Sequence, residues 1–98
     1  MTPEGKVKVA VRKVLQEFGA YWFMPVQTGF GAQGVDFFCC VDGRFVAVET
    51  KRPGRVNDAT PRQEMTLKAV RAAGGLAYVV DDASTLRAYL IRDLGGLR

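Results

Sequence analysis

The sequence predicts an α/β domain in which helices pack on a mixed β-sheet. Three observations indicate this class. Apolar residues recur at helical spacing near both ends of the chain, and short strand-like apolar segments lie between them. The order is helix, three strands, helix, strand and helix, which places a βαβ unit in the second half. Because 98 residues suffice for one modest core, we expect residues 1–98 to form one domain.

The first helix is predicted to start after Thr2, because Thr2-Pro3-Glu4 offers an N-cap, a first-turn proline and an acid near the positive end of the helix dipole. Gly19 is a fitting stop. The inward positions are Val7, Val11, Val14, Leu15 and Phe18. Residues 20–26 then predict a short strand whose aromatic residues lie in the core. Residues 27–34 contain three glycines and predict a loop.

The next two strands are predicted to form a hairpin around Asp42-Gly43, a pair typical of two-residue turns. Counting outward from this turn places Asp36 directly opposite Glu49. Opposed residues share one face of a sheet, with Cβ atoms about 4.5–5.5 Å apart. Lys51, two residues after Glu49, shares that face. We expect the face to be substantially buried, because its other members are Phe38, Cys40, Phe45 and Ala47.

A polar loop over 52–60 precedes a second helix that starts at Thr60. Gly74 and Gly75 end this helix, and residues 76–80 are continuously apolar, as in a buried strand. The last helix is predicted to begin at an N-cap formed by Ser84. The inward positions of the two helices are Leu67, Val70, Leu86, Leu90 and Leu94.

Composition excludes several kinds of active site. The chain has no histidine, which excludes Ser-His-Asp and Cys-His triads and histidine-based zinc sites. Cys39 and Cys40 are adjacent, so in a strand they point to opposite faces and cannot share a metal; we expect buried, reduced thiols. No apolar run is long enough to cross a bilayer and no signal peptide is visible, so we expect a cytoplasmic protein without a membrane partner.

Asp36, Glu49 and Lys51 suggest a specific chemistry. Two carboxylates opposed on a semi-buried face repel each other unless a cation lies between them. Mg²⁺ suits such a pair, because it takes oxygen ligands and contacts substrate phosphates. Lys51 would orient a water or neutralise charge on a phosphate, as in a metal-assisted phosphodiester hydrolase. A solvated acid at the sheet end and a Glu49–Lys51 ion pair are the alternative, and a one-residue slip in register would separate the acids.

Glu4 and Gln63 each allow two interpretations. Glu4 is either a first-turn acid that favours the helix dipole or a third carboxylate near the metal. Gln63 completes a capping box with Thr60, but its side chain also faces the sheet and is able to hold a water or phosphate beside the site.

The formal charge of +4 favours an anionic partner. Arg52, Arg55 and Arg62 around the polar loop, and Lys6 on the first helix, are candidate contacts to DNA phosphates. Solvation of these residues, and of Lys8 on the same helix, is the alternative interpretation.

Four segments together resemble the VRR-NUC group of the PD-(D/E)XK nuclease superfamily, in its stand-alone, phage-type form. These are "TPEGKVKVAVRKVL", "GVDFFCCVDGRFVAVETK", "TPRQ" and "AAGGLAYVV". They cover most of the chain in the family's order. The resemblance implies a restriction-endonuclease-like fold of order αβββαβα. One departure is Val35, which replaces the usual proline before the aspartate; valine is compatible with a strand, and proline supplies no ligand.

The resemblance also implies roles for individual residues. Asp36 and Glu49 match the metal ligands, and Lys51 matches the catalytic lysine. Thr50 matches the position whose backbone carbonyl joins the metal shell. The acidic residue of the family's first helix and the glutamine of its later helix correspond to Glu4 and Gln63, which favours their functional interpretations, with Glu4 at the metal.

The implied activity is Mg²⁺- or Mn²⁺-dependent endonucleolytic cleavage of DNA in a bacterial or phage-infected cell. Compact members are associated with homodimers that act on branched DNA, especially four-way (Holliday) junctions, as in DNA repair. Two alternatives stay open. One is a DNA-binding module that is catalytically silent or depends on a protein partner, and the other is a purely structural phage protein.

Overall fold

A computed structural model describes residues 1–26 and 34–95 of the chain. Its elements are α1 (Pro3–Glu17), β1 (Tyr21–Phe23), β2 (Phe37–Val41), β3 (Arg44–Thr50), α2 (Pro61–Ala72), β4 (Leu76–Val80) and α3 (Ala83–Leu94). This order confirms the predicted αβββαβα arrangement. The loop predicted over 27–34 lies, apart from Gly34, outside the described residues.

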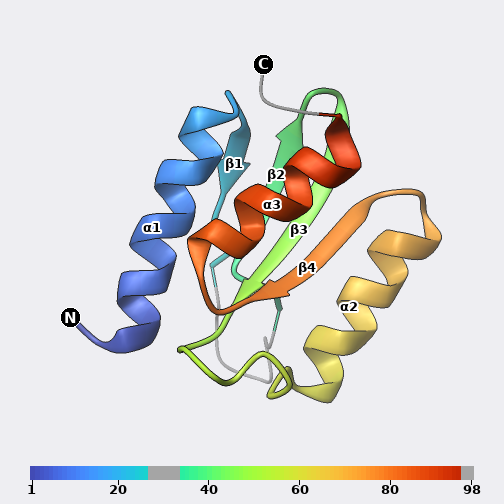
Figure 1. Cartoon of the computed structure of the whole chain (residues 1–98). Helices are drawn as coiled ribbons and strands as arrows, with labels where there is room; N and C mark the ends of the chain where they lie inside the picture. The colour runs from blue at the N-terminus through green and yellow to red at the C-terminus, as the bar shows by residue number, and fades with distance from the viewer. Residues whose placement is uncertain (27–33, 96–98) are drawn as a thin grey trace.

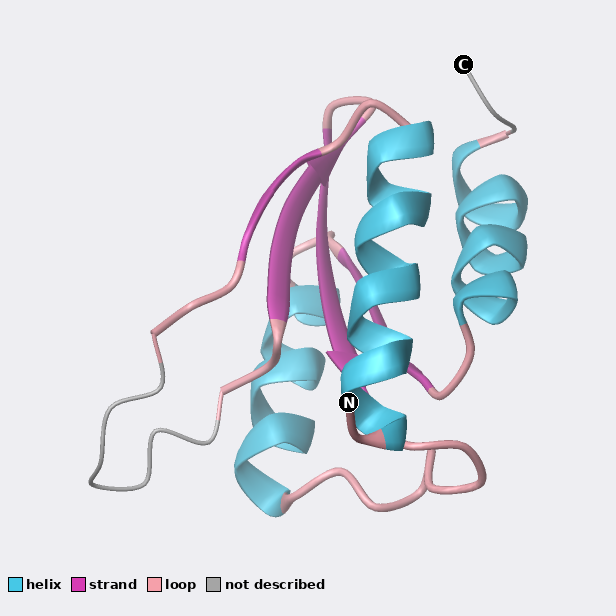
Figure 2. Cartoon of the chain, turned by 90° about the vertical axis from the view of Figure 1, so that its left-hand side faces the viewer, coloured by secondary structure: helices cyan, strands magenta, loops and turns pink. Residues whose placement is uncertain are grey.

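The four strands form one mixed sheet in the order β1-β2-β3-β4. β1 and β2 pair antiparallel, as do β2 and β3, whereas β3 and β4 are parallel neighbours. The predicted βαβ unit of β3, α2 and β4 is thereby confirmed. Figures 1 and 2 show three layers, with α1 and α3 on one face of the sheet and α2 on the other.

The hairpin between β2 and β3 has the predicted register. Asp42 and Gly43 take φ values of 51° and 78°, the left-handed conformation that a tight two-residue turn requires. Val41 pairs with Arg44, and the pairing continues to Phe37 opposite Val48. One further step brings Asp36, just before β2, opposite Glu49 in β3.

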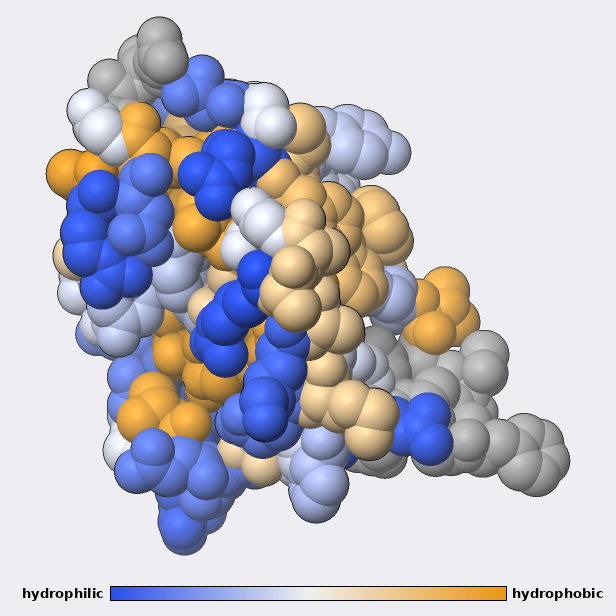
Figure 3. Space-filling view, turned by 90° about the vertical axis from the view of Figure 1, so that its right-hand side faces the viewer, coloured by the Kyte–Doolittle hydropathy of each residue, from blue (hydrophilic) through white to orange (hydrophobic). Residues whose placement is uncertain are grey.

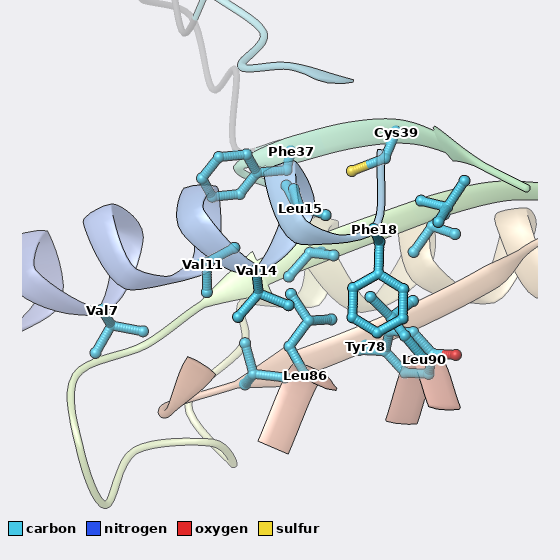
Figure 4. Packing of buried hydrophobic residues seen from close by; sticks show 14 residues of the cluster. Val7, Val11, Val14, Leu15, Phe18, Phe37, Cys39, Tyr78, Leu86 and Leu90 are labelled. Carbon is cyan, nitrogen blue, oxygen red and sulfur yellow. The ribbon is translucent and has the colours of Figure 1, made fainter. Parts of the chain in front are cut away.

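The main core lies between the sheet and the α1/α3 layer (Figure 4). Successive strand residues point to opposite faces of the sheet. Every second side chain, such as Phe37 and Val48, therefore packs here against the inward residues of α1 and the leucines of α3. A smaller cluster fills the space under α2 and consists of Val35, Ala47, Leu67 and Ala77. The hairpin face that carries Ala47 and Glu49 lies on the side of this smaller cluster.

The helix caps follow the predictions in two of three cases. Thr2 accepts a hydrogen bond from the Gly5 amide, and Thr60 caps α2 in a capping box with Gln63. The prediction for α3 is wrong, because Asp82 is its N-cap and Ser84 donates to the Asp82 carboxylate. Asp82, two residues earlier, accepts a hydrogen bond from the Ser84 amide and places a negative charge at the positive end of the helix.

Two further predictions about burial are wrong, for one reason. Tyr21 and Phe23 are 73% and 49% exposed, and only Trp22 of this strand packs on the core. Cys40 and Phe45 are exposed as well. All four residues occupy the α2-side face of the sheet, and α2 packs on β3 and β4, so it leaves the β1 side of that face uncovered. Cys39, on the core face, is buried, and this burial raises the pKa of its thiol to about 12.

Among the described residues, no helix combines the length and apolar character that a membrane span requires.

Candidate functional site

The site lies where three chain segments meet at one end of the sheet (Figures 1 and 2). The C-terminal end of β3, the first turn of α1 and the first turn of α2 gather there, near the loop over 51–60. Ligand sites of α/β proteins commonly form at the carboxyl ends of parallel strands, and β3 and β4 end here side by side.

Hydrogen bonds hold Asp36 against the end of β3, where it contacts both Glu49 and Thr50. The Asp36 amide donates to Glu49 Oε1 over 3.1 Å, and Asp36 Oδ2 accepts from the Thr50 amide over 3.0 Å. The Thr50 hydroxyl donates to the same Asp36 oxygen. Because Asp36 precedes the first residue of β2, its carboxylate is not confined to one face. It therefore reaches toward α1 while Glu49 lies on the α2 side.

Glu49 is the most deeply buried acid of the site, with 2% of its surface exposed. Its Oε2 atom accepts a hydrogen bond from Gln63 Nε2 over 2.9 Å and lies 3.2 Å from Lys51 Nζ. Lys51 is itself mostly buried, with 14% of its side chain exposed. The carboxylate is therefore held by an ammonium group and an amide from two different elements.

The pKa of Glu49 is raised from 4.5 to about 7, first by burial and then by the nearby charge of Asp36. Lys51 favours the charged form and only partly offsets these effects. The Glu49 carboxyl is therefore buried close to a second acid. Oxygen ligands that are crowded in this way suit a hard divalent cation such as Mg²⁺ or Mn²⁺.

Gln63 forms the expected capping box and also contacts two residues of the site. Its Oε1 atom accepts from the Thr60 amide over 2.9 Å, which completes the capping box, and also from Lys51 Nζ over 3.1 Å. Its Nε2 atom donates to Glu49. The capping box thus fixes the one amide side chain that bridges Lys51 and Glu49.

Glu4 joins the site through Lys8 instead of directly. Lys8 Nζ lies 3.3 Å from Glu4 Oε2 and 3.7 Å from Asp36 Oδ1. Within residues 1–26 and 34–95, no group of three or more acidic or cysteine side chains is arranged to hold one ion. Asp36 and Glu49 are therefore the acids that meet directly, and Glu4 is linked to Asp36 through Lys8.

The candidate DNA contacts surround this end of the molecule. Arg52 and Arg55 are exposed in the loop after β3, and Arg62 is exposed in the first turn of α2. Lys6 is exposed on the first turns of α1. Arg55 also pairs with Asp58 over 3.4 Å, at a position where both side chains are about half exposed.

Lys8 is the site residue that sequence reasoning missed, since we expected it to be solvated. A weak signal was present: Glu4 and Lys8 are four residues apart on one helix, a spacing that favours an ion pair. The second partner, Asp36, comes from a distant strand, and helical spacing alone does not reveal it.

Comparison with known proteins supports the fold. A solved structure described as a VRR_NUC domain aligns with this chain at a TM-score of 0.75 and 19% sequence identity, and the alignment covers 95% of this chain and 98% of that one. No family model and no curated protein matches the sequence. At this identity the likeness concerns the fold, and it confirms the VRR-NUC resemblance at that level.

Proposed function

We propose that this chain, which shares the fold of a VRR_NUC domain, is a divalent-metal-dependent DNA endonuclease that hydrolyses phosphodiester bonds. One observation carries the proposal. At the strand ends the Glu49 carboxylate accepts hydrogen bonds from the Asp36 backbone amide and from Gln63, and it forms an ion pair with Lys51. Such an acid pair suits a divalent ion, and an adjacent lysine can stabilise the negative charge that develops in phosphodiester hydrolysis.

Mg²⁺ or Mn²⁺ would be held by Asp36, Glu49 and the backbone carbonyl of Thr50. When bound, such an ion polarises a phosphoryl oxygen and lowers the pKa of a coordinated water. Glu4, beyond Lys8, is the acid placed to serve a second ion or its waters.

Lys51 acts on the attacking water or on the developing negative charge of the phosphate. Its ammonium group is held between Glu49 and Gln63, at 3.2 and 3.1 Å. This support fixes the lysine before substrate arrives, so little reorganisation is needed during the reaction. Gln63 accordingly orients Lys51 and Glu49 at the same time.

Arg52, Arg55, Arg62 and Lys6 bind the DNA backbone on either side of the scissile phosphate. Phosphate contacts of this kind position the substrate without reading its sequence, which suits an enzyme that selects by DNA structure.

We further propose that branched DNA, such as a four-way junction, is the substrate, and that a homodimer acts on it. The uncovered sheet face supports a second copy, since exposed large apolar side chains in a small domain are typical of interaction surfaces. We call it the open aromatic face and define it by Tyr21, Phe23, Phe38 and Phe45. Two sites related by a two-fold axis would make paired cuts in a symmetric junction.

A cleavage assay tests the activity. End-labelled four-way junction, flap, single-stranded and duplex DNA would be incubated with Mg²⁺, Mn²⁺ or EDTA and with wild type, Asp36→Asn, Glu49→Ala or Lys51→Ala. We expect metal-dependent cutting, preferably of the branched substrates, and a loss of at least about 10²-fold in each variant. Glu64→Gln, an exposed acid beside Gln63 in the chain, is the matched control and should cut like wild type.

Folded wild type that binds DNA in a salt-dependent way but never cuts it would replace this proposal with the DNA-binding module. Cutting that appears only after a cell extract is added would indicate a partner-dependent enzyme. A chain that neither binds nor cuts DNA would favour a structural protein.

A further inference from the structure

We propose that Lys8 is a working residue of the site that acts as a resident counter-cation. In the metal-free protein its ammonium group neutralises Asp36 and Glu4, and when a divalent ion binds at Asp36 the same group is released to hold a DNA phosphate. This inference rests on the proposed nuclease function and assigns a role to a residue outside the acid-acid-lysine pattern.

The contacts of Asp36 show how its two oxygens are divided. Oδ2 is turned inward and accepts hydrogen bonds from the amide and hydroxyl of Thr50. Oδ1 lies 3.7 Å from Lys8 Nζ. With 16% of the Asp36 side chain exposed, the oxygen that faces Lys8 is the one placed to bind an incoming ion.

Charge counting gives Lys8 its role. The site contains three acids, Glu4, Asp36 and Glu49, and two lysines, Lys8 and Lys51, so its formal charge is −1. Lys51 forms an ion pair with Glu49, and Lys8 forms ion pairs with Glu4 and Asp36. A divalent ion bound to Asp36 would sit within a few ångströms of the Lys8 ammonium, and like charges at that distance repel each other in a partly buried site. Lys8 must therefore move away as the ion binds.

The side chain of Lys8 is suited to such a movement. It is 30% exposed, against 14% for Lys51, and its ion pairs with Glu4 and Asp36 are 3.3 and 3.7 Å long. A lysine has a flexible four-carbon stem and a compact point charge. The nearest new anion in a loaded site is the phosphate of the DNA strand, because the ion binds that phosphate at the same edge of the site.

The test uses two measurements that need no cleavage. Mn²⁺ binding to the free protein would be measured by electron paramagnetic resonance. Binding of a four-way junction would be measured in Ca²⁺ at several salt concentrations. The variants are Lys8→Met, which keeps the stem and removes the charge, and Lys8→Arg, which keeps the charge. Lys13→Met is the matched control, since Lys13 is exposed on the same helix.

For Lys8→Met we expect Mn²⁺ to bind about three- to tenfold more tightly, because one competing charge is gone. Junction binding should weaken, with the salt dependence reduced by about one phosphate contact. Lys8→Arg should bind the junction like wild type, and Lys13→Met should match wild type in Mn²⁺ binding.

Unchanged or weaker Mn²⁺ binding by folded Lys8→Met would overturn the inference, and so would unchanged junction binding, because Lys8 would then hold no phosphate in the loaded site. If wild type binds Mn²⁺ and cuts DNA, that failure concerns Lys8 alone. The proposed function itself fails if wild type binds no Mn²⁺, or if Asp36→Asn binds Mn²⁺ as tightly as wild type. The inference about Lys8 then fails with it.

Discussion

Glu49 is an acid in an unfavourable place for its negative charge. It is 2% exposed and beside Asp36, and its pKa is raised to about 7. Such a carboxyl is costly in the metal-free protein, because ionising it in a buried place beside another acid is unfavourable. A cation bound beside Glu49 would favour its ionised form and offset this cost.

The raised pKa predicts a pH dependence of stability. Between 4.5 and about 7 the folded protein keeps a proton on Glu49 that the unfolded chain has lost. Since stability falls with pH wherever the folded state binds more protons, the contribution of Glu49 is full below 4.5 and declines up to about pH 7. The expected loss is on the order of 3 kcal/mol at most.

Urea unfolding in EDTA at pH 5 and pH 8 measures this effect. Glu49→Gln should remove most of the decline and exceed wild type in stability at pH 8, while Glu64→Gln, at an exposed position, should follow wild type. An equal decline in wild type and Glu49→Gln would show that other groups cause it.

At the scale of elements, the capping box of α2 has a second purpose. Thr60 accepts a hydrogen bond from the Gln63 amide over 3.2 Å, and this fixes the first turn that presents Gln63 to Lys51 and Glu49. Local helix chemistry and the geometry of the site are therefore coupled through one residue.

Thr60→Ala removes that cap and should reduce the free energy of unfolding by about 1 kcal/mol, within a range of about 0.5–2 kcal/mol. Chemical denaturation followed by circular dichroism measures the change. Thr60→Ser keeps the hydroxyl and serves as the control, with a loss of less than half that of alanine. Equal stability of the alanine and serine variants would mean that the hydroxyl contributes nothing.

At the scale of the whole molecule, the two faces of the sheet differ in how well they are covered. Two helices cover one face, whereas α2 covers only part of the other. On the open aromatic face, the ring centroid of Phe38 in β2 lies 5.8 Å from that of Phe23 in β1 and 5.6 Å from that of Phe45 in β3. Figure 3 shows a band of apolar surface on the side of the molecule that includes α2, bordered by hydrophilic residues.

The proposed homodimer predicts that this face controls association. Light scattering coupled to size exclusion should give wild type about twice the 10.7 kDa chain mass. Phe45→Glu should give the monomer mass, because it places a charge where apolar surface would be buried. Ile91→Glu changes an apolar residue of α3 that is 44% exposed, on the opposite side of the sheet, and should leave the dimer intact. Monomeric wild type at high concentration, or a dimeric Phe45→Glu, would contradict the proposal.

The order of the elements, the limits of the βαβ unit and the register that sets Asp36 opposite Glu49 can all be predicted from the amino-acid sequence. These features depend on local chemistry: apolar periodicity, a turn dipeptide that accepts positive φ, and side-chain alternation along a strand. The residue pattern also predicted that Lys51 shares a face with Glu49 and that Gln63 caps the second helix while facing the sheet, and the contacts agree.

The covering of each sheet face and the set of residues that meet at the site depend on how the helices pack on the sheet. Alternation assigns Phe45 and Cys40 to a face, but whether they are buried depends on where α2 lies on the sheet. The contact of Lys8 with Asp36 likewise joins a helix to a strand end almost thirty residues away in the chain. Such contacts follow from the packing of whole elements, for which local propensity contains no information.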